Sequence, residues 1–173
     1  MTNSIKRYIL DKNVNFDVLN ENLDINKLII NNKKIGINEI GIINKLTNID
    51  EISFNFCEIN EEKISLPNTL KYLSYSFCKG DVKCNCALEK LEELEILEDT
   101  EDAVIVDIDD LLQFKNLKVL RIYNCKIKNS ININKYENLE KVYLDGSLAD
   151  VEDFSDILNK NIKLSCKRNY LYD

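Results

Sequence analysis

Apolar residues recur in a short pattern along this chain. In the segment 117–127 they occupy the first, fourth and sixth positions, with Cys125 at the ninth and Ile127 at the eleventh. The segment 49–59 follows the same pattern, with Cys57 at its ninth position. The fourth and sixth positions alternate with more polar ones, as a strand with one buried side requires. Each copy of the pattern therefore predicts one short β-strand.

The pattern repeats at a mean interval of 22 residues. Complete or degenerate copies begin at residues 5, 25, 49, 70, 91, 117, 139 and 159, with intervals of 20 to 26 residues. One such copy cannot bury its apolar side alone, so neighbouring copies have to stack on one another. We therefore expect a single domain over residues 1–173. Its central copies would occupy residues 25–150, with degenerate or capping copies at residues 1–24 and 151–173.

The segments between the predicted strands differ in character. Residues 37–48 and 151–160 carry apolar side chains at helical spacing, which predicts short helices. Residues 110–114 predict a single helical turn. Residues 61–69 contain the only proline of the chain, which favours an extended or 3₁₀ conformation there.

The repeated pattern LxxLxLxx(N/C)xL, with Cys at its ninth position in the copies that begin at 49, 70 and 117, resembles the leucine-rich repeat family over essentially the whole chain. The resemblance implies an α/β fold, a right-handed solenoid of about eight repeats. A curved parallel β-sheet would form its concave face, and short helices, 3₁₀ turns or extended segments its convex face. It also implies a non-catalytic protein–protein interaction module that presents the concave surface.

The ninth position would lie where the chain turns inward. In the family, Asn at this position bonds backbone groups of the adjacent repeat, and Cys can replace it. A thiol can be buried there as a weak donor. We therefore expect Cys57, Cys78 and Cys125, with Cys166 near the same level, to form a structural ladder rather than a catalytic or metal site.

The third, fifth and seventh positions of each copy are expected to point outward from the sheet. Towards the C-terminal half they form an aromatic and charged set: Tyr72, Glu93, Glu95, Leu97, Arg121, Tyr123, Tyr143 and Asp145. Tyr and Arg are enriched at binding hot spots, so we expect these residues to contact a protein partner. The alternative is that the exposed tyrosines only favour strand formation. In the last copy, Lys163 would take the fifth position and Ser165 the seventh.

The composition of the chain argues against several kinds of functional site. The chain has no His among 173 residues, which excludes Ser–His and Cys–His pairs and His-ligated metals. Its four glycines lie far apart, so no phosphate-binding loop is indicated. We therefore expect no enzyme, no cofactor and no metal. A formal charge of −7 without a basic stripe also argues against nucleic acid as a partner.

The acidic side chains are concentrated in one stretch. Residues 89–110 contain eleven acidic residues and one basic residue, whereas the remaining 151 residues contain 19 acidic and 22 basic ones. Such a stretch is either a solvated surface or an acidic patch that attracts a basic protein. The second interpretation makes a protein with a basic surface the expected partner. It also yields a sharper alternative, a small immunity or inhibitor protein that neutralises a basic toxin or enzyme.

Two other interpretations stay open. Cys84 and Cys86, together with Cys78, raise a metal-binding or thiol-enzyme role, although zinc requires four ligands and no His is present. The apolar Ile9 and Ile29, at outward positions, would allow pairing with another subunit, as in a scaffold; no oligomeric state is specified.

The sequence also predicts a location. The first 15 residues lack the apolar segment of a signal peptide, and the chain has no run of about 18 apolar residues. We therefore expect a cytoplasmic protein that does not act at a membrane.

Overall fold

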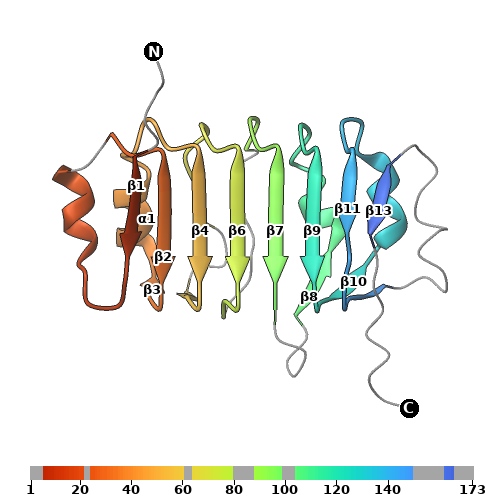
Figure 1. Cartoon of the computed structure of the whole chain (residues 1–173), viewed down its shortest axis with the longest axis horizontal. Helices are drawn as coiled ribbons and strands as arrows, with labels where there is room; N and C mark the ends of the chain where they lie inside the picture. Colours follow the sequence, from red (N-terminus) through yellow and green to blue (C-terminus); the bar gives the residue numbers. More distant parts are fainter. Residues whose placement is uncertain are drawn as a thin grey trace. The chain divides into compact units, whose positions relative to one another are not determined.

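The computed structural model describes residues 6–21, 24–60, 64–79, 88–98, 104–149 and 162–165. The chain divides into two compact units, Met1–Leu91 and Glu92–Asp173 (Figure 1). Both units combine parallel strands with few and short helices, which confirms the predicted α/β class and the predicted parallel sheet. Within the described residues, eight strands, four in each unit, form the main parallel pairing.

The first unit contains a parallel sheet in the order β1-β2-β4-β6. Its strands are β1 (Arg7–Leu10), β2 (Lys27–Asn31), β4 (Glu51–Asn55) and β6 (Tyr72–Ser76). A second, two-stranded parallel pair is made by β3 (Lys34–Ile35) and β5 (Glu58–Ile59). The helical elements are the 3₁₀ helix η1 (Phe16–Glu21) and the α-helix α1 (Ile37–Ile43).

The second unit contains a parallel sheet in the order β7-β9-β11-β13. Its strands are β7 (Glu93–Leu97), β9 (Val119–Tyr123), β11 (Lys141–Tyr143) and β13 (Lys163–Ser165). A separate three-stranded sheet has the order β12-β10-β8, with β8 (Ile105–Asp107), β10 (Lys126–Lys128) and β12 (Leu148–Ala149). The helical elements are α2 (Ile108–Leu111) and the 3₁₀ helix η3 (Ser130–Lys135).

Equivalent positions of neighbouring copies lie side by side in these sheets. Lys27 pairs with Glu51, Glu51 pairs with Tyr72, and Glu93 pairs with Val119, all at third positions. The fourth and sixth positions point to the opposite side and are buried, as Leu120 and Ile122 are in β9. The predicted alternation is confirmed in β2, β4 and β7, where buried and partly exposed residues alternate. Val119 in β9 and Ser74 in β6 depart from it, because these third- and fifth-position residues are buried.

The last strand departs from the predicted register. Lys163 pairs with Lys141, and Ser165 pairs with Tyr143, so β13 is displaced by two residues from the expected pairing of Lys163 with Tyr143. A shift of one residue would have exchanged the two sides of the strand. A shift of two residues keeps every side chain on its side, and the hydrophobic pattern therefore cannot detect it.

The helices lie close to the predicted places. Within residues 37–48, α1 ends at Ile43. The turn predicted over 110–114 begins earlier, at Ile108, because the Asp107 carboxylate accepts a hydrogen bond from the Asp109 N–H and caps α2. The helix predicted over 151–160 lies outside the described residues. Among the described residues, no helix has the length and apolar character needed to cross a membrane.

In five copies the eighth position turns the chain out of its strand in a left-handed conformation. Positive φ angles of 53° to 73° occur at five such positions: Asn32, Phe56, Phe77, Asn124 and Gly146. Asn and Gly tolerate this region, whereas a bulky side chain in it is unusual. The two phenylalanines are therefore the exceptions in a recurring turn.

The ninth position directs a donor towards the preceding copy in several repeats, although the Cys125 thiol donates to the Tyr123 carbonyl of its own copy at 3.3 Å. The Cys57 thiol donates to the Ile30 carbonyl at 3.4 Å, and the Cys78 thiol donates to the Phe54 carbonyl at 3.4 Å. The Ser147 hydroxyl donates to the Ile122 carbonyl at 2.9 Å in the same way. Cys57, Cys78 and Cys125 are buried free thiols, which confirms their predicted burial; Cys166 lies outside the described residues.

Candidate protein-binding surface

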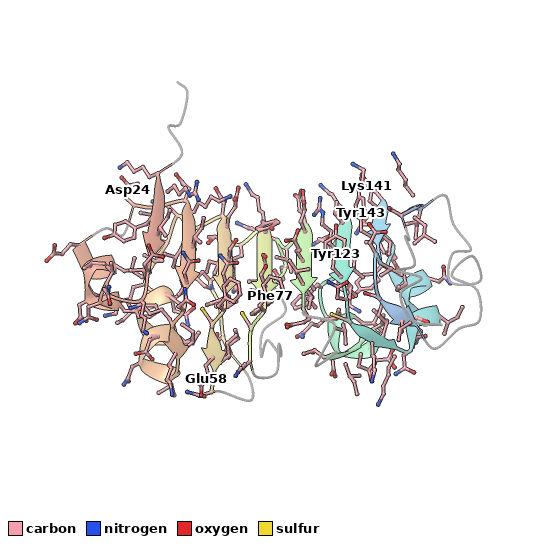
Figure 2. All side chains as sticks on the ribbon, turned by 60° about the horizontal axis from the view of Figure 1, so that its bottom comes forward. Asp24, Glu58, Phe77, Tyr123, Lys141 and Tyr143 are labelled. Atoms are coloured by element: carbon pink, nitrogen blue, oxygen red, sulfur yellow. The ribbon has the colours of Figure 1, made fainter. Side chains whose placement is uncertain are left out.

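Seven of the eight residues expected to contact a partner lie on one side of the sheet in the second unit. They are Glu93, Glu95 and Leu97 from β7, Arg121 and Tyr123 from β9, Tyr143 from β11, and Asp145 just after β11. We call this set the tyrosine face; Figure 2 labels Tyr123 and Tyr143 on it. Each of the seven is partly exposed. The eighth residue, Tyr72, lies on β6 in the first unit and is described there.

The pairing of three strands brings these side chains together. Glu95 lies beside Arg121, Leu97 lies beside Tyr123, and Arg121 lies beside Tyr143. Because alternate residues point to the same side, these fifth and seventh positions share one surface. Side chains at neighbouring positions of adjacent strands are close enough to interact.

Arg121 is held in place by its neighbours. Its Nη1 donates to Glu93 Oε2 at 2.7 Å, and its guanidinium carbon lies 5.3 Å from the centre of the Tyr143 ring. Partial burial alone would lower the pKa of Arg121, but the hydrogen bond to Glu93 and the charge of Glu95 raise it above its usual value. The positive charge of Arg121 is therefore already engaged within the protein.

Tyr123 lies among charges of both signs. Partial burial raises its pKa; the positive charge of Arg121 opposes this rise, and the charges of Glu95 and Asp145 add to it. The Asp145 carboxylate accepts a hydrogen bond from the Ser165 hydroxyl at 3.5 Å. The phenol of Tyr123 thus stays neutral near the carboxylates of Glu95, on β7, and Asp145, just after β11.

Tyr72 has a corresponding environment in the first unit. The Lys27 ammonium forms an ion pair with Glu51 and lies 6.0 Å from the centre of the Tyr72 ring. Sequence reasoning placed Lys27 and Glu51 outward but did not include them among the binding residues. Their opposite charges at third positions of adjacent copies were the signal that could have identified the pair.

The acidic stretch 89–110 does not present its described acids on one surface. Glu98 is buried, with 6% of its surface exposed. Glu92 pairs with Lys118 at 3.0 Å, and Asp107 accepts a hydrogen bond from Asn129 at 2.9 Å while it caps α2. Of the eight described acids, only Glu93 and Glu95 belong to the tyrosine face. The net charge follows the units instead: residues 1–91 have 12 basic and 12 acidic residues, and residues 92–173 have 11 and 18.

An exposed aromatic pair in the first unit was not expected from the sequence. The rings of Phe56 and Phe77 stack with centres 5.0 Å apart, and Phe56 is 59% exposed. Both residues occupy the left-handed eighth position. The signal available in the sequence was the presence of Phe where the copies that begin at 25, 117 and 139 have Asn or Gly.

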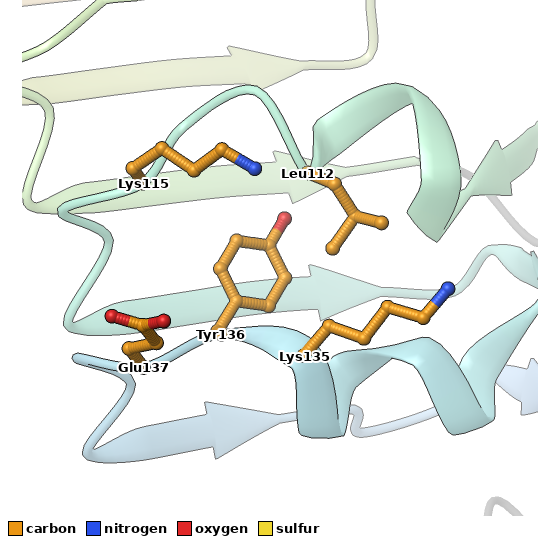
Figure 3. A pocket seen from close by; sticks show the side chains of 5 residues that line it. All are labelled: Leu112, Lys115, Lys135, Tyr136 and Glu137. Atoms are coloured by element: carbon orange, nitrogen blue, oxygen red, sulfur yellow. The ribbon is translucent and has the colours of Figure 1, made fainter.

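A pocket of about 250 Å³ lies in the second unit, lined by Leu112, Lys115, Lys135, Tyr136 and Glu137 (Figure 3). Burial raises the pKa of Tyr136, whose side chain forms the centre of the lining. The remaining polar lining consists of exposed side chains of both charges. This lining favours neither an anion nor a cation, and we assign the pocket no role.

The thiols form no metal cluster in the part of the chain that the structure describes. No group of three or more Cys, Asp or Glu residues there is arranged to hold a metal ion. Cys84 and Cys86 lie outside the described residues. Burial, and secondarily the charge of Glu98, raise the pKa of the Cys125 thiol to about 12. Contact with Cys57, together with burial, raises the pKa of the Cys78 thiol.

Comparison with protein-family models found no match to this chain. Comparison with curated proteins found no match either.

Proposed function

We propose that this protein is a non-catalytic module that binds another protein through the tyrosine face. The observation that carries the proposal is the combination of Leu97, Tyr123 and Tyr143, all partly exposed, around an arginine that is already held in place. Tyrosine buries a large area on binding while keeping its hydroxyl available for a hydrogen bond. Tyr and Arg are also the residue types that dominate binding energy at protein interfaces.

The rigidity of the surface supports this function. The face is built on paired strands rather than on loops, and the Glu93–Arg121 contact fixes one of its longest side chains. Ordering such a side chain on binding costs about 0.5–1.5 kcal/mol, and much of this cost is avoided when the side chain is already ordered. A preorganised face of this kind favours recognition of a folded partner.

We also propose that the repeats form a leucine-rich-repeat solenoid, with the tyrosine face on its concave side. Three recurring features support it: parallel pairing of equivalent positions, a left-handed eighth residue, and a ninth residue that donates to the preceding copy. Ser147 and Cys57 play the same part in different units. Repetition of one local structure along the chain is the property that makes a solenoid.

The test is affinity capture with the full chain and two variants. Immobilised wild type, the Tyr123→Ala/Tyr143→Ala double variant and Leu148→Ala are exposed to lysate of the source organism, and retained proteins are identified by mass spectrometry. Leu148 is 68% exposed on β12, outside the tyrosine face, and serves as the matched control. We expect one protein to be retained by wild type and Leu148→Ala and lost from the double variant. Equal retention by all three would contradict the proposal.

A further inference from the structure

Charge is distributed unevenly on the tyrosine face and its margin. The Arg121 guanidinium donates to Glu93, and Glu95 and Asp145 are the two other acidic residues of the tyrosine face. Lys141 begins β11, four residues before Asp145, and pairs in register with Lys163. Four residues of strand span about 13 Å, which separates Lys141 from Asp145, whereas Glu93 lies level with Lys141 because both pair with Val119.

In two places the protein binds one of its own cationic side chains between a carboxylate and a tyrosine ring. Arg121 lies between the Glu93 carboxylate and the Tyr143 ring, which come from the strands on either side of it. In the first unit, the Lys27 ammonium contacts the Glu51 carboxylate and lies over the Tyr72 ring. A carboxylate and an aromatic ring from nearby strands therefore form a recurring cation site in this chain, combining an ion pair with a cation–π contact.

Tyr123 provides the same two elements a third time. Its ring lies on β9, where Tyr123 pairs with Leu97, so Glu95 lies two residues away on the same side of β7. Asp145 follows β11 directly beside this point, because its carbonyl accepts a hydrogen bond from the Asn124 N–H at 3.3 Å. Glu95 forms no ion pair shorter than 4.0 Å among the described residues. Tyr123 and Glu95 are both partly exposed, so a cation from outside the chain can reach them.

We propose that an arginine or lysine side chain of the protein partner binds over Tyr123, between Glu95 and Asp145. This inference rests on the proposed function and names the partner's chemistry at that surface. Charge complementarity supports a cation, because the second unit carries the whole net charge of −7. Arginine suits such a site especially well, because its planar guanidinium can stack on a ring while it donates to a carboxylate.

The site can be tested with a simple probe before the partner is known. A tetra-arginine peptide is titrated into the full-length protein at low salt, and the tyrosine ring resonances are followed by NMR. Tetra-glutamate serves as the opposite-charge probe. We expect saturable shifts of the Tyr123 resonances with tetra-arginine and no shifts there with tetra-glutamate.

Matched variants distinguish binding of the peptide at Tyr123 from non-specific attraction of a basic peptide to an acidic protein. Glu95→Gln and Asp110→Asn each remove one negative charge from the second unit, but Asp110 lies on α2. We expect the dissociation constant for tetra-arginine to rise about tenfold in Glu95→Gln and less than about twofold in Asp110→Asn. Lys141→Gln removes a positive charge at the start of β11, outside the tyrosine face, and should leave the dissociation constant unchanged or lower it.

Three results would overturn the inference. These are an absence of Tyr123 shifts with tetra-arginine, equal weakening by Glu95→Gln and Asp110→Asn, and preferential binding of tetra-glutamate beside Lys141. Failure here can be told apart from failure of the proposed function. If capture of a partner still depends on Tyr123 and Tyr143, the protein-binding role stands and only the cation is refuted.

Discussion

Replacement of Ser147 by alanine should destabilise the second unit through two buried backbone groups. Ser147 is 3% exposed. Its hydroxyl accepts a hydrogen bond from the Cys125 N–H at 3.2 Å and donates one to the Ile122 carbonyl at 2.9 Å. Alanine can do neither, so both backbone groups lose this side-chain partner while they stay buried.

The magnitude follows from the cost of leaving a buried polar group without its hydrogen bond, which is about 1–3 kcal/mol. The N–H has one hydrogen to donate, whereas the carbonyl oxygen has a second lone pair, so the N–H should account for most of the loss. We expect Ser147→Ala to lower the free energy of unfolding by about 2–3 kcal/mol. For a chain of this length the corresponding fall in Tm is about 4–12 °C.

The chain supplies its own control. Cys57 and Cys78 occupy the position equivalent to Ser147 and donate to the preceding copy through a thiol. Ser147→Cys keeps a weak donor and acceptor and should lose less stability than Ser147→Ala. Equilibrium urea unfolding followed by far-UV circular dichroism measures both. A loss below about 0.5 kcal/mol in Ser147→Ala, the range of ordinary surface changes, would refute this account of the ninth position.

Three other perturbations test separate parts of the structure. Leu120→Ala, at a fully buried position, should lower the free energy of unfolding in urea by about 2–5 kcal/mol. Tyr123→Ala, on the partly exposed side of β9, should lower it by less than about 1 kcal/mol. Equal losses would show that the two sides of β9 are misassigned. Because the pKa of Cys125 is raised from 9.0 to about 12, the unfolded chain loses that proton at lower pH than the folded protein. The stabilising contribution of the neutral Cys125 thiol is therefore complete below pH 9 and lost as pH rises towards 12. Between pH 9 and 12, the free energy of unfolding should fall less steeply with pH in Cys125→Ala than in the wild type. Asp107→Ala should lower the free energy of unfolding by about 0.5–2 kcal/mol, because α2 loses its N-terminal cap. Asp107→Asn keeps an acceptor oxygen and should lower it by less. Equal losses in the two variants would show that the cap is not the cause.

The strand positions could be predicted because each copy repeats the same apolar positions. Ile52 and Leu73, at fourth positions of adjacent copies, pair in the register that the repeats predict. Burial of one side of a strand requires apolar and polar residues to alternate with a period of two, and this alternation can be seen in the sequence. The same alternation identified Arg121, Tyr123 and Tyr143 as members of one exposed side.

Features that depend on tertiary partners could not be predicted. The two-residue displacement of β13 keeps every side chain on its side, so Lys163 fits either register equally well. Glu98 belongs to a strongly acidic stretch, yet the fold buries it. A serine such as Ser147 is common in turns, so its residue type does not show that it bonds to the preceding copy. Only the positions of the Cys125 N–H and the Ile122 carbonyl reveal this role. Engagement of Arg121 by Glu93 likewise depends on the pairing of β7 with β9.

Site-specific photo-crosslinking tests the proposed binding surface most directly. Tyr123→p-benzoylphenylalanine places a photoreactive group on the tyrosine face, and Leu148→p-benzoylphenylalanine places the same group at a position that is 68% exposed on β12. Each variant is irradiated in lysate of the source organism, and the adducts are identified by mass spectrometry. Our account predicts a single dominant adduct with a basic protein from position 123 and none of that protein from position 148. The same adduct from both positions, or its formation from position 148 alone, would contradict the account.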